Sequence, residues 1–228
     1  GKYASRNRIW SNHSIPSSNG LPSLARRLQT VGYRTVLCGK QHYMPGRRYG
    51  FHEIGGDYNH YEKVGWVMRR DPDDESINHE LARERFADFQ VSNRSGIFRH
   101  DEPITERVTR FLHGQSNYDS PYLLFVGFKA PHFPLTVPRC EYRRVQGKVP
   151  MPVVPRGMLE SQPFNYHHLR RAFGVVDVDP DTVKFGRELY SGLVGWMDGH
   201  VGAVLRALRT SPTRDNTIVI YLSDHGEN

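Results

Sequence analysis

The sequence predicts an α/β protein with a mostly parallel sheet that carries helices on both faces. Three times along the chain, a segment with apolar residues at helical spacing is followed by a short apolar run typical of a buried strand. Because a parallel strand is reached only through a crossover connection, usually a helix, this repeated order favours parallel pairing. The runs are apolar throughout, as expected for strands covered on both sides.

The first helix–strand pair joins a predicted helix over residues 22–31 to a predicted strand over 33–37. Pro22 opens the helix and Gly32 ends it, at positions where these two residues are favoured. The strand leads into Gly39, so a loop is expected directly after it.

The second and third helix–strand pairs repeat this order. Pro103 is expected to open a helix that precedes a strand over 122–128, and a long amphipathic helix over 184–209 precedes a strand over 217–222. Between these helix–strand pairs, residues 43–100 and 139–183 show no clear periodicity, and we expect irregular excursions there.

The composition excludes several classes of protein. The longest unbroken apolar run, Tyr122–Phe128, is far shorter than the roughly 18 residues of a membrane helix, so no membrane-spanning segment is predicted. The net charge is +7, with 31 basic residues scattered as pairs and not gathered in a block. Since no nucleic-acid recognition motif accompanies this charge, we expect anionic ligands but no nucleic acid as partner.

Polar residues of catalytic type follow each predicted strand. The carboxyl ends of parallel strands are where ligands bind, because the connecting loops converge there. The segments in these places are Gly39–His42, Ala130–Pro134 and Ser223–Gly226. A functional site is therefore predicted at this edge of the sheet.

Lys40 and His42 are one residue apart, so an extended backbone lets both side chains point the same way. An ammonium beside an imidazole suits an anionic substrate. The alternative is a solvated lysine and a surface histidine.

His132 is held between Pro131 and Pro134, which make its segment stiff and extended. A stiff loop suits a proton donor, although a turn that happens to contain a histidine would have the same sequence.

Asp224 and His225 directly follow the third predicted strand, and such adjacent oxygen and nitrogen ligands suit a divalent cation. Two ligands do not complete a metal site, so others must come from elsewhere. A helix cap at Asp224 with a neighbouring histidine is the alternative.

A second acidic pattern is set aside. Asp177, Asp179, Asp181 and Glu188 match the ligand spacing of a helix-loop-helix calcium site, but Thr182 stands where glycine is required. We expect these residues to serve the long helix instead, with Asp181 or Thr182 as its cap.

Taken in order, these segments resemble the sulfatase family of the alkaline phosphatase superfamily, most closely choline sulfatase-like bacterial sulfatases. The resemblance covers most of the chain and is weakest over 57–100. The segments that carry it are Leu21–Ala25, Gly32–Thr35, Gly39–His42, Pro131–His132, Met197–Asp198, Val201–Gly202 and Ser223–Glu227. It implies that residues 1–228 are a partial sulfatase catalytic domain of alkaline phosphatase-like fold, truncated at both ends.

The resemblance implies hydrolysis of a sulfate ester of a small molecule or polysaccharide by a formylglycine nucleophile and a divalent metal. Lys40 and His42 would contact the sulfate and the nucleophile, His132 would protonate the leaving alcohol, and Asp224 and His225 would hold the metal. That metal would be Ca²⁺, with Mn²⁺ or Zn²⁺ as alternatives because of His225. The C/S-x-P-S-R motif that yields formylglycine is absent from the 228 residues, so we expect it upstream and expect this fragment alone to be inactive.

Two other functions fit the same residues. A phosphodiesterase or phosphonate monoester hydrolase of the same superfamily would use a similar cationic site. A non-catalytic module that binds an anionic polysaccharide would need only the arginine pairs.

Overall fold

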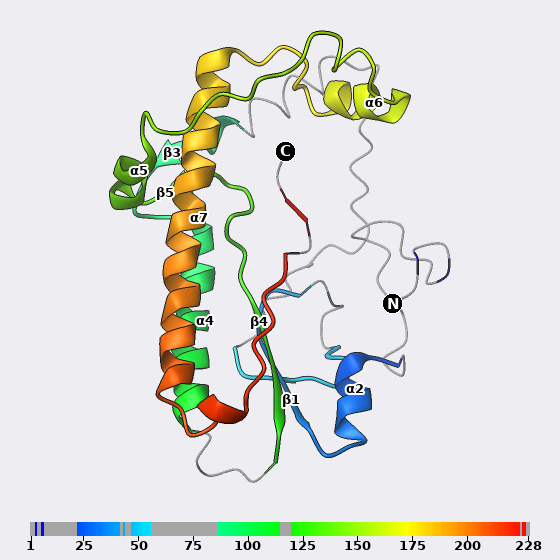
Figure 1. The fold of residues 1–228 in the computed structure, drawn as a ribbon, viewed down its shortest axis with the longest axis vertical. Helices are drawn as coiled ribbons and strands as arrows, with labels where there is room; N and C mark the ends of the chain where they lie inside the picture. Colours follow the sequence, from blue (N-terminus) through cyan, green and yellow to red (C-terminus); the bar gives the residue numbers. More distant parts are fainter. Residues whose placement is uncertain are drawn as a thin grey trace. The chain divides into compact units, whose positions relative to one another are not determined.

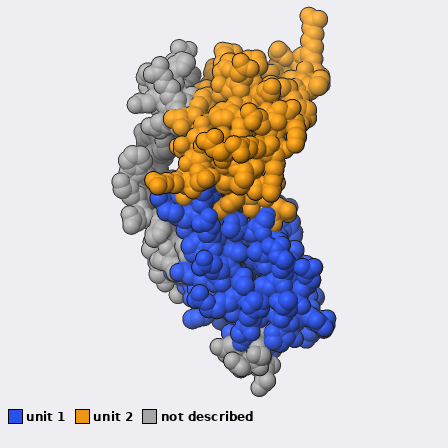
Figure 2. Space-filling view, turned by 90° about the vertical axis from the view of Figure 1, so that its left-hand side faces the viewer, with its two compact units in different colours: residues 1–67, 96–129, 199–228 blue, residues 68–95, 130–198 orange. Residues whose placement is uncertain are grey.

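The computed structural model of the chain describes residues 22–41, 43, 47–55, 86–114, 120–223, 225 and 226, together with residues 3 and 6. These residues form two compact units, coloured separately in Figure 2. The first unit is drawn from residues 1–67, 96–129 and 199–228, and the second from 68–95 and 130–198. Among the described helices, none combines the length and apolar character needed to cross a membrane.

The first unit contains a parallel sheet with strand order β2-β1-β4. These strands are β2 (His52–Glu53), β1 (Arg34–Gly39) and β4 (Tyr122–Gly127), and Figure 1 shows β1 and β4 side by side. The register pairs Arg34 with Tyr122 and Gly39 with Gly127, so β1 and β4 end at the same level. The prediction of a parallel sheet is confirmed for these strands.

Helices cover both faces of this sheet. On one face Cys38 packs against α4 (Gly96–His113), where its thiol contacts the Ile104 carbonyl. On the other face the Thr35 side chain accepts a hydrogen bond from Gln29 of α2 (Leu24–Gln29). Because side chains alternate along a strand, these contacts lie on opposite faces. The core on the α4 face combines strand and helix residues: Cys38, Ile104, Val108, Leu112 and Ala207.

The second unit contains a two-stranded parallel sheet of β3 (Gln90–Val91) and β5 (Thr136–Val137). Its helices are α5 (Arg139–Val145), α6 (Phe164–Ala172) and the first part of α7 (Pro180–Arg209). Residues 199–209 of α7 belong to the first unit, and the short 3-10 helix η2 (Arg214–Asn216) follows them.

Glu188 of α7 is buried and bound within this second unit. Its carboxylate accepts hydrogen bonds from the Tyr142 hydroxyl at 3.0 Å and from the Gly147 amide at 2.8 Å. Partial burial and, after it, the contact with Glu188 raise the pKa of Tyr142. Since both oxygens of the Glu188 carboxylate accept hydrogen bonds inside this unit, Glu188 has the structural role that was expected of it.

The predicted starts of two helices were wrong. Helix α4 begins at Gly96 and continues through Pro103, because the turn before the proline is buried and its packing outweighs the lost hydrogen bond. Helix α7 begins at Pro180, and its cap is Asp179, whose carboxylate accepts the Thr182 amide at 2.8 Å. Hydrogen bonds with Thr182 lower the pKa of Asp179. The expectation that Asp181 or Thr182 is the cap was wrong, because both lie inside the first turn of the helix.

The predicted strand over 217–222 does not form in the described part of the chain. Residues 217–223 carry no regular secondary structure, and Ile218 and Leu222 are 89% and 81% exposed. A strand needs a hydrogen-bonded neighbour, and no described segment pairs with this one.

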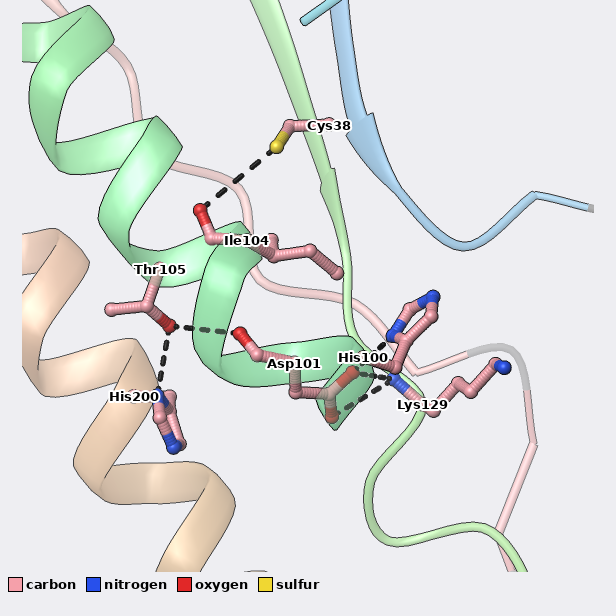
Figure 3. Close-up of polar contacts among 7 residues, drawn as sticks. All are labelled: Cys38, His100, Asp101, Ile104, Thr105, Lys129 and His200. Carbon is pink, nitrogen blue, oxygen red and sulfur yellow. Dashed lines mark hydrogen bonds and ion pairs between the residues drawn. The ribbon is translucent and has the colours of Figure 1, made fainter. Parts of the chain in front are cut away.

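Helices α4 and α7 are joined by a polar contact inside the first unit. Thr105 of α4 lies 2.8 Å from Nδ1 of His200 on α7, and the Thr105 hydroxyl also lies 3.3 Å from the Asp101 carbonyl (Figure 3). Burial lowers the pKa of His200 below 6.5, although the nearby charges of Asp101 and Glu102 oppose that shift.

We predict that replacing Gly39 with alanine destabilises the protein. Gly39 has φ +103°, and a Cβ there would lie 2.1 Å from the Gly127 carbonyl oxygen. The expected loss in the free energy of unfolding of the full-length protein is about 1–3 kcal/mol or more, measured by urea denaturation. In the control Gly199→Ala the Cβ meets nothing within 4 Å, so stability should stay equal or rise. Equal stability of the Gly39 variant and wild type would contradict the described strand approach.

We predict that His200 makes stability fall as the pH drops. The unfolded chain takes up this proton near pH 6.5, whereas the folded state resists it until a lower pH. The free energy of unfolding should therefore decline less between pH 7 and pH 5 in His200→Gln than in wild type. Parallel profiles for the two proteins would show that His200 is not held neutral by the fold.

Candidate functional site

Lys40 stands at the carboxyl end of β1, where the main chain fixes its position. Its backbone N–H donates to the Gly127 carbonyl at 2.8 Å, which continues the β1–β4 ladder by one residue. The approach is so close that a Cβ on Gly127 would lie 2.3 Å from the Lys40 carbonyl oxygen. Lys40 is half-buried. The sequence-based placement of Lys40 at a strand end is confirmed.

Lys129 stands two residues beyond the end of β4, and it was missed by the sequence analysis. Its backbone N–H donates to both carboxylate oxygens of Asp101, at 2.9 and 3.1 Å. Figure 3 shows the Lys129 side chain extending away from the Asp101 carboxylate. The rule that finds residues after strand ends would have found Lys129, had it been applied one residue earlier than Ala130.

The two lysine side chains influence each other electrostatically. The pKa of Lys129 is lowered chiefly because partial burial disfavours the charged ammonium, and the positive charge of Lys40 lowers it further. The Asp101 carboxylate acts in the opposite direction. Two cations therefore lie near each other where β1 and β4 end, which is an arrangement that attracts anions.

Asp101 organises the turn after β4 from helix α4. Its side chain is fully buried and Nδ1 of the buried His100 lies 2.5 Å from its Oδ1. A buried carboxylate is stable only when its oxygens are hydrogen-bonded or paired, and here both oxygens accept the Lys129 amide.

His132 lies in the second unit and is exposed. Its Nδ1 is 2.8 Å from the Phe133 carbonyl oxygen. Because a carbonyl only accepts, Nδ1 carries the hydrogen and Nε2 is the atom that can exchange a proton with a ligand. The neighbouring Phe133 ring stacks on Phe89, with centroids 6.3 Å apart, which anchors the loop.

His225 is exposed and belongs to the first unit. Its Nδ1 is 2.9 Å from the Gly226 carbonyl oxygen, and the Ser223 hydroxyl donates to the His225 carbonyl. By the same reasoning Nδ1 of His225 carries the hydrogen. Within the described ranges, no group of three or more histidine, cysteine or acidic side chains could hold a metal ion.

The structure places one predicted site residue, Lys40, beside a lysine that was not predicted, Lys129. Lys40 and Lys129 lie near each other at neighbouring strand ends of the first unit. His42 and Asp224 fall outside the described residues. The convergence of His132 and His225 with Lys40 stays a prediction.

Comparisons with known proteins identify the family. The family model described as Sulfatase matches residues 1–228. The chain is 26% identical over 232 residues to the uncharacterized sulfatase YidJ of Escherichia coli and 26% identical over 249 residues to choline-sulfatase of Rhizobium meliloti. Each match covers 100% of this chain and 46% of the relative. Human iduronate 2-sulfatase is 29% identical over 140 residues, which covers 55% of this chain and 25% of the relative.

The chain thus spans about half the length of the first two relatives, 46% in each case. The match to the family model nevertheless includes every segment from which the site was predicted.

We predict that Asp101→Asn destabilises the first unit. The amide nitrogen of asparagine would place hydrogens against either the Lys129 amide or His100, and a buried donor would lose its acceptor. The expected loss is about 2–4 kcal/mol in the free energy of unfolding of the full-length protein. Glu102→Gln is the matched control, since Glu102 is the exposed neighbour on the same helix and should change stability little. Similar losses in both variants would argue against a special role for Asp101.

Proposed function

Because the chain belongs to the sulfatase family, we propose that the protein of which it is part hydrolyses sulfate esters. The observation that carries this proposal is the match of the family model to the whole of residues 1–228. The pair of cations at the ends of β1 and β4 supports it, because a sulfuryl group spreads negative charge over several oxygens.

Each site residue has a proposed role. Lys40 and His42 bind the sulfate and the nucleophile, and Lys40 is held for this task by the hydrogen bond that its backbone N–H donates to the Gly127 carbonyl. His132 donates a proton from Nε2 to the leaving alcohol oxygen, since its Nδ1 is engaged by the Phe133 carbonyl.

The proposed metal and nucleophile complete the site. Asp224 and His225 would hold a divalent cation, and their donor set fits one: a carboxylate suits calcium, while the imidazole also admits manganese or zinc. The bound metal would polarise the sulfate oxygens. The nucleophile, formylglycine, would come from a part of the protein outside these 228 residues, which lack its C/S-x-P-S-R motif.

The proposed substrates are sulfated small molecules or sulfated polysaccharides. Two relatives are named for choline, a small molecule, and for iduronate, a sugar acid of the kind that polysaccharides contain, and these names support the proposal. The catalytic domain would include residues 1–228, with the excursions at 43–100 and 139–183 shaping its pocket.

One relative favours a second candidate function. The multifunctional alkaline phosphatase superfamily protein PehA of Trinickia caryophylli is 27% identical over 139 residues. Its name places it in the alkaline phosphatase superfamily. The alternative that we keep is a phosphodiesterase or phosphonate monoester hydrolase of that superfamily, which would use a similar cationic site.

We predict that the full-length protein hydrolyses 4-nitrophenyl sulfate faster than a 4-nitrophenyl phosphodiester. In His132→Gln, kcat should fall roughly 10²–10⁴-fold, and more for an alkyl sulfate than for 4-nitrophenyl sulfate, because a poor leaving group depends more on its proton donor. His168→Gln, an exposed histidine of the same unit, is the control and should keep wild-type rates.

A strong preference for the phosphodiester would replace sulfatase by phosphodiesterase in this proposal. Binding of a sulfated polysaccharide without turnover of any ester would favour the non-catalytic module.

A further inference from the structure

Main-chain hydrogen bonds fix the position of Lys129. These bonds do not involve its side chain. Its amide is bound by Asp101, and Lys40 is placed beside the same strand end by its bond to the Gly127 carbonyl. Within the described part of the chain, the ion pairs are formed by Arg48, Arg144, Arg214 and His100, and by neither lysine.

Holding two ammonium groups near each other opposes folding. Partial burial disfavours the charge on Lys129 and the repulsion from Lys40 adds to that penalty, whereas the nearby Asp101 carboxylate offsets part of it. The penalty is relieved when an anion binds between or beside the two groups. Sulfate esters carry a single negative charge, which the proposed role of Lys40 already meets, so a second anionic group on the substrate is the natural counterpart of Lys129.

Resting on the proposed sulfatase function, we propose that Lys129 is a specificity-determining residue. It selects sulfate esters that carry a second anionic group, a carboxylate or another sulfate, close to the ester that is cleaved. The same charge repels substrates with a cationic group, such as a quaternary ammonium. Figure 3 shows the side chain directed away from Asp101, so this acid does not neutralise it through a direct contact.

A purely structural role is separable from this one. The hydrogen bonds to Asp101 come from the Lys129 backbone, so Lys129→Gln keeps them and removes only the ammonium group. Lys129→Arg keeps the positive charge. Lys148→Gln is the matched control, because Lys148 is exposed and lies in the other unit.

The test uses the full-length enzyme and three aryl sulfates that differ only in one ring substituent: a carboxylate, a neutral carboxamide or a trimethylammonium group. In Lys129→Gln we expect kcat/KM for the carboxylate substrate to fall about tenfold relative to the carboxamide, and kcat/KM for the trimethylammonium substrate to rise relative to it. Lys129→Arg and Lys148→Gln should retain the wild-type order of substrates. An equal change for all three substrates, or none, would overturn the proposal.

Binding gives a readout that does not depend on turnover. The corresponding benzenesulfonates, titrated by calorimetry, should show the same charge preference in wild type and its loss in Lys129→Gln. If wild type hydrolyses no sulfate ester, the proposed function fails while calorimetry still decides the role of Lys129. If hydrolysis occurs and neither assay shows a charge preference, only the inference about Lys129 fails.

Discussion

The contact between the ends of β1 and β4 is the constraint on which the site depends. The Lys40 amide reaches the Gly127 carbonyl at 2.8 Å only because Gly39 and Gly127 have no side chains. A Cβ on either glycine would overlap the backbone of the other strand. This close approach fixes where the chain leaves the sheet, and it brings Lys40 and Lys129 near each other.

Helix α4 fixes the position of the charged residue Lys129 at the carboxyl end of β4. Asp101 projects from the helix, binds the amide of Lys129 and contacts His100 in the interior. Thr105, one turn further along, connects the same helix to His200 of α7. The position of the second lysine therefore depends on helix packing as well as on the sheet.

Much of the first unit could be predicted from sequence because its elements carry local signals. The apolar runs of β1 and β4 and the rule about carboxyl ends were sufficient to place Lys40. The same rule also applies to Lys129, but its anchoring by Asp101 was not predictable, since the two residues are 28 positions apart and pairing at that distance leaves no pattern in the sequence. The helix start predicted at Pro103 was wrong for a related reason. The residues before Pro103 stay helical because they are buried against other elements, and the local sequence does not show this tertiary effect.

The central claim is that Lys40, His132 and the Asp224–His225 pair surround one oxyanion. A crystal structure of the full-length protein with bound inorganic sulfate tests it most directly. The account predicts a sulfate contacted by the Lys40 ammonium and by Nε2 of His132, with a metal ion between the sulfate and the Asp224–His225 pair. A sulfate bound elsewhere, with these three segments tens of ångströms apart, on the order of a domain's size, would contradict it.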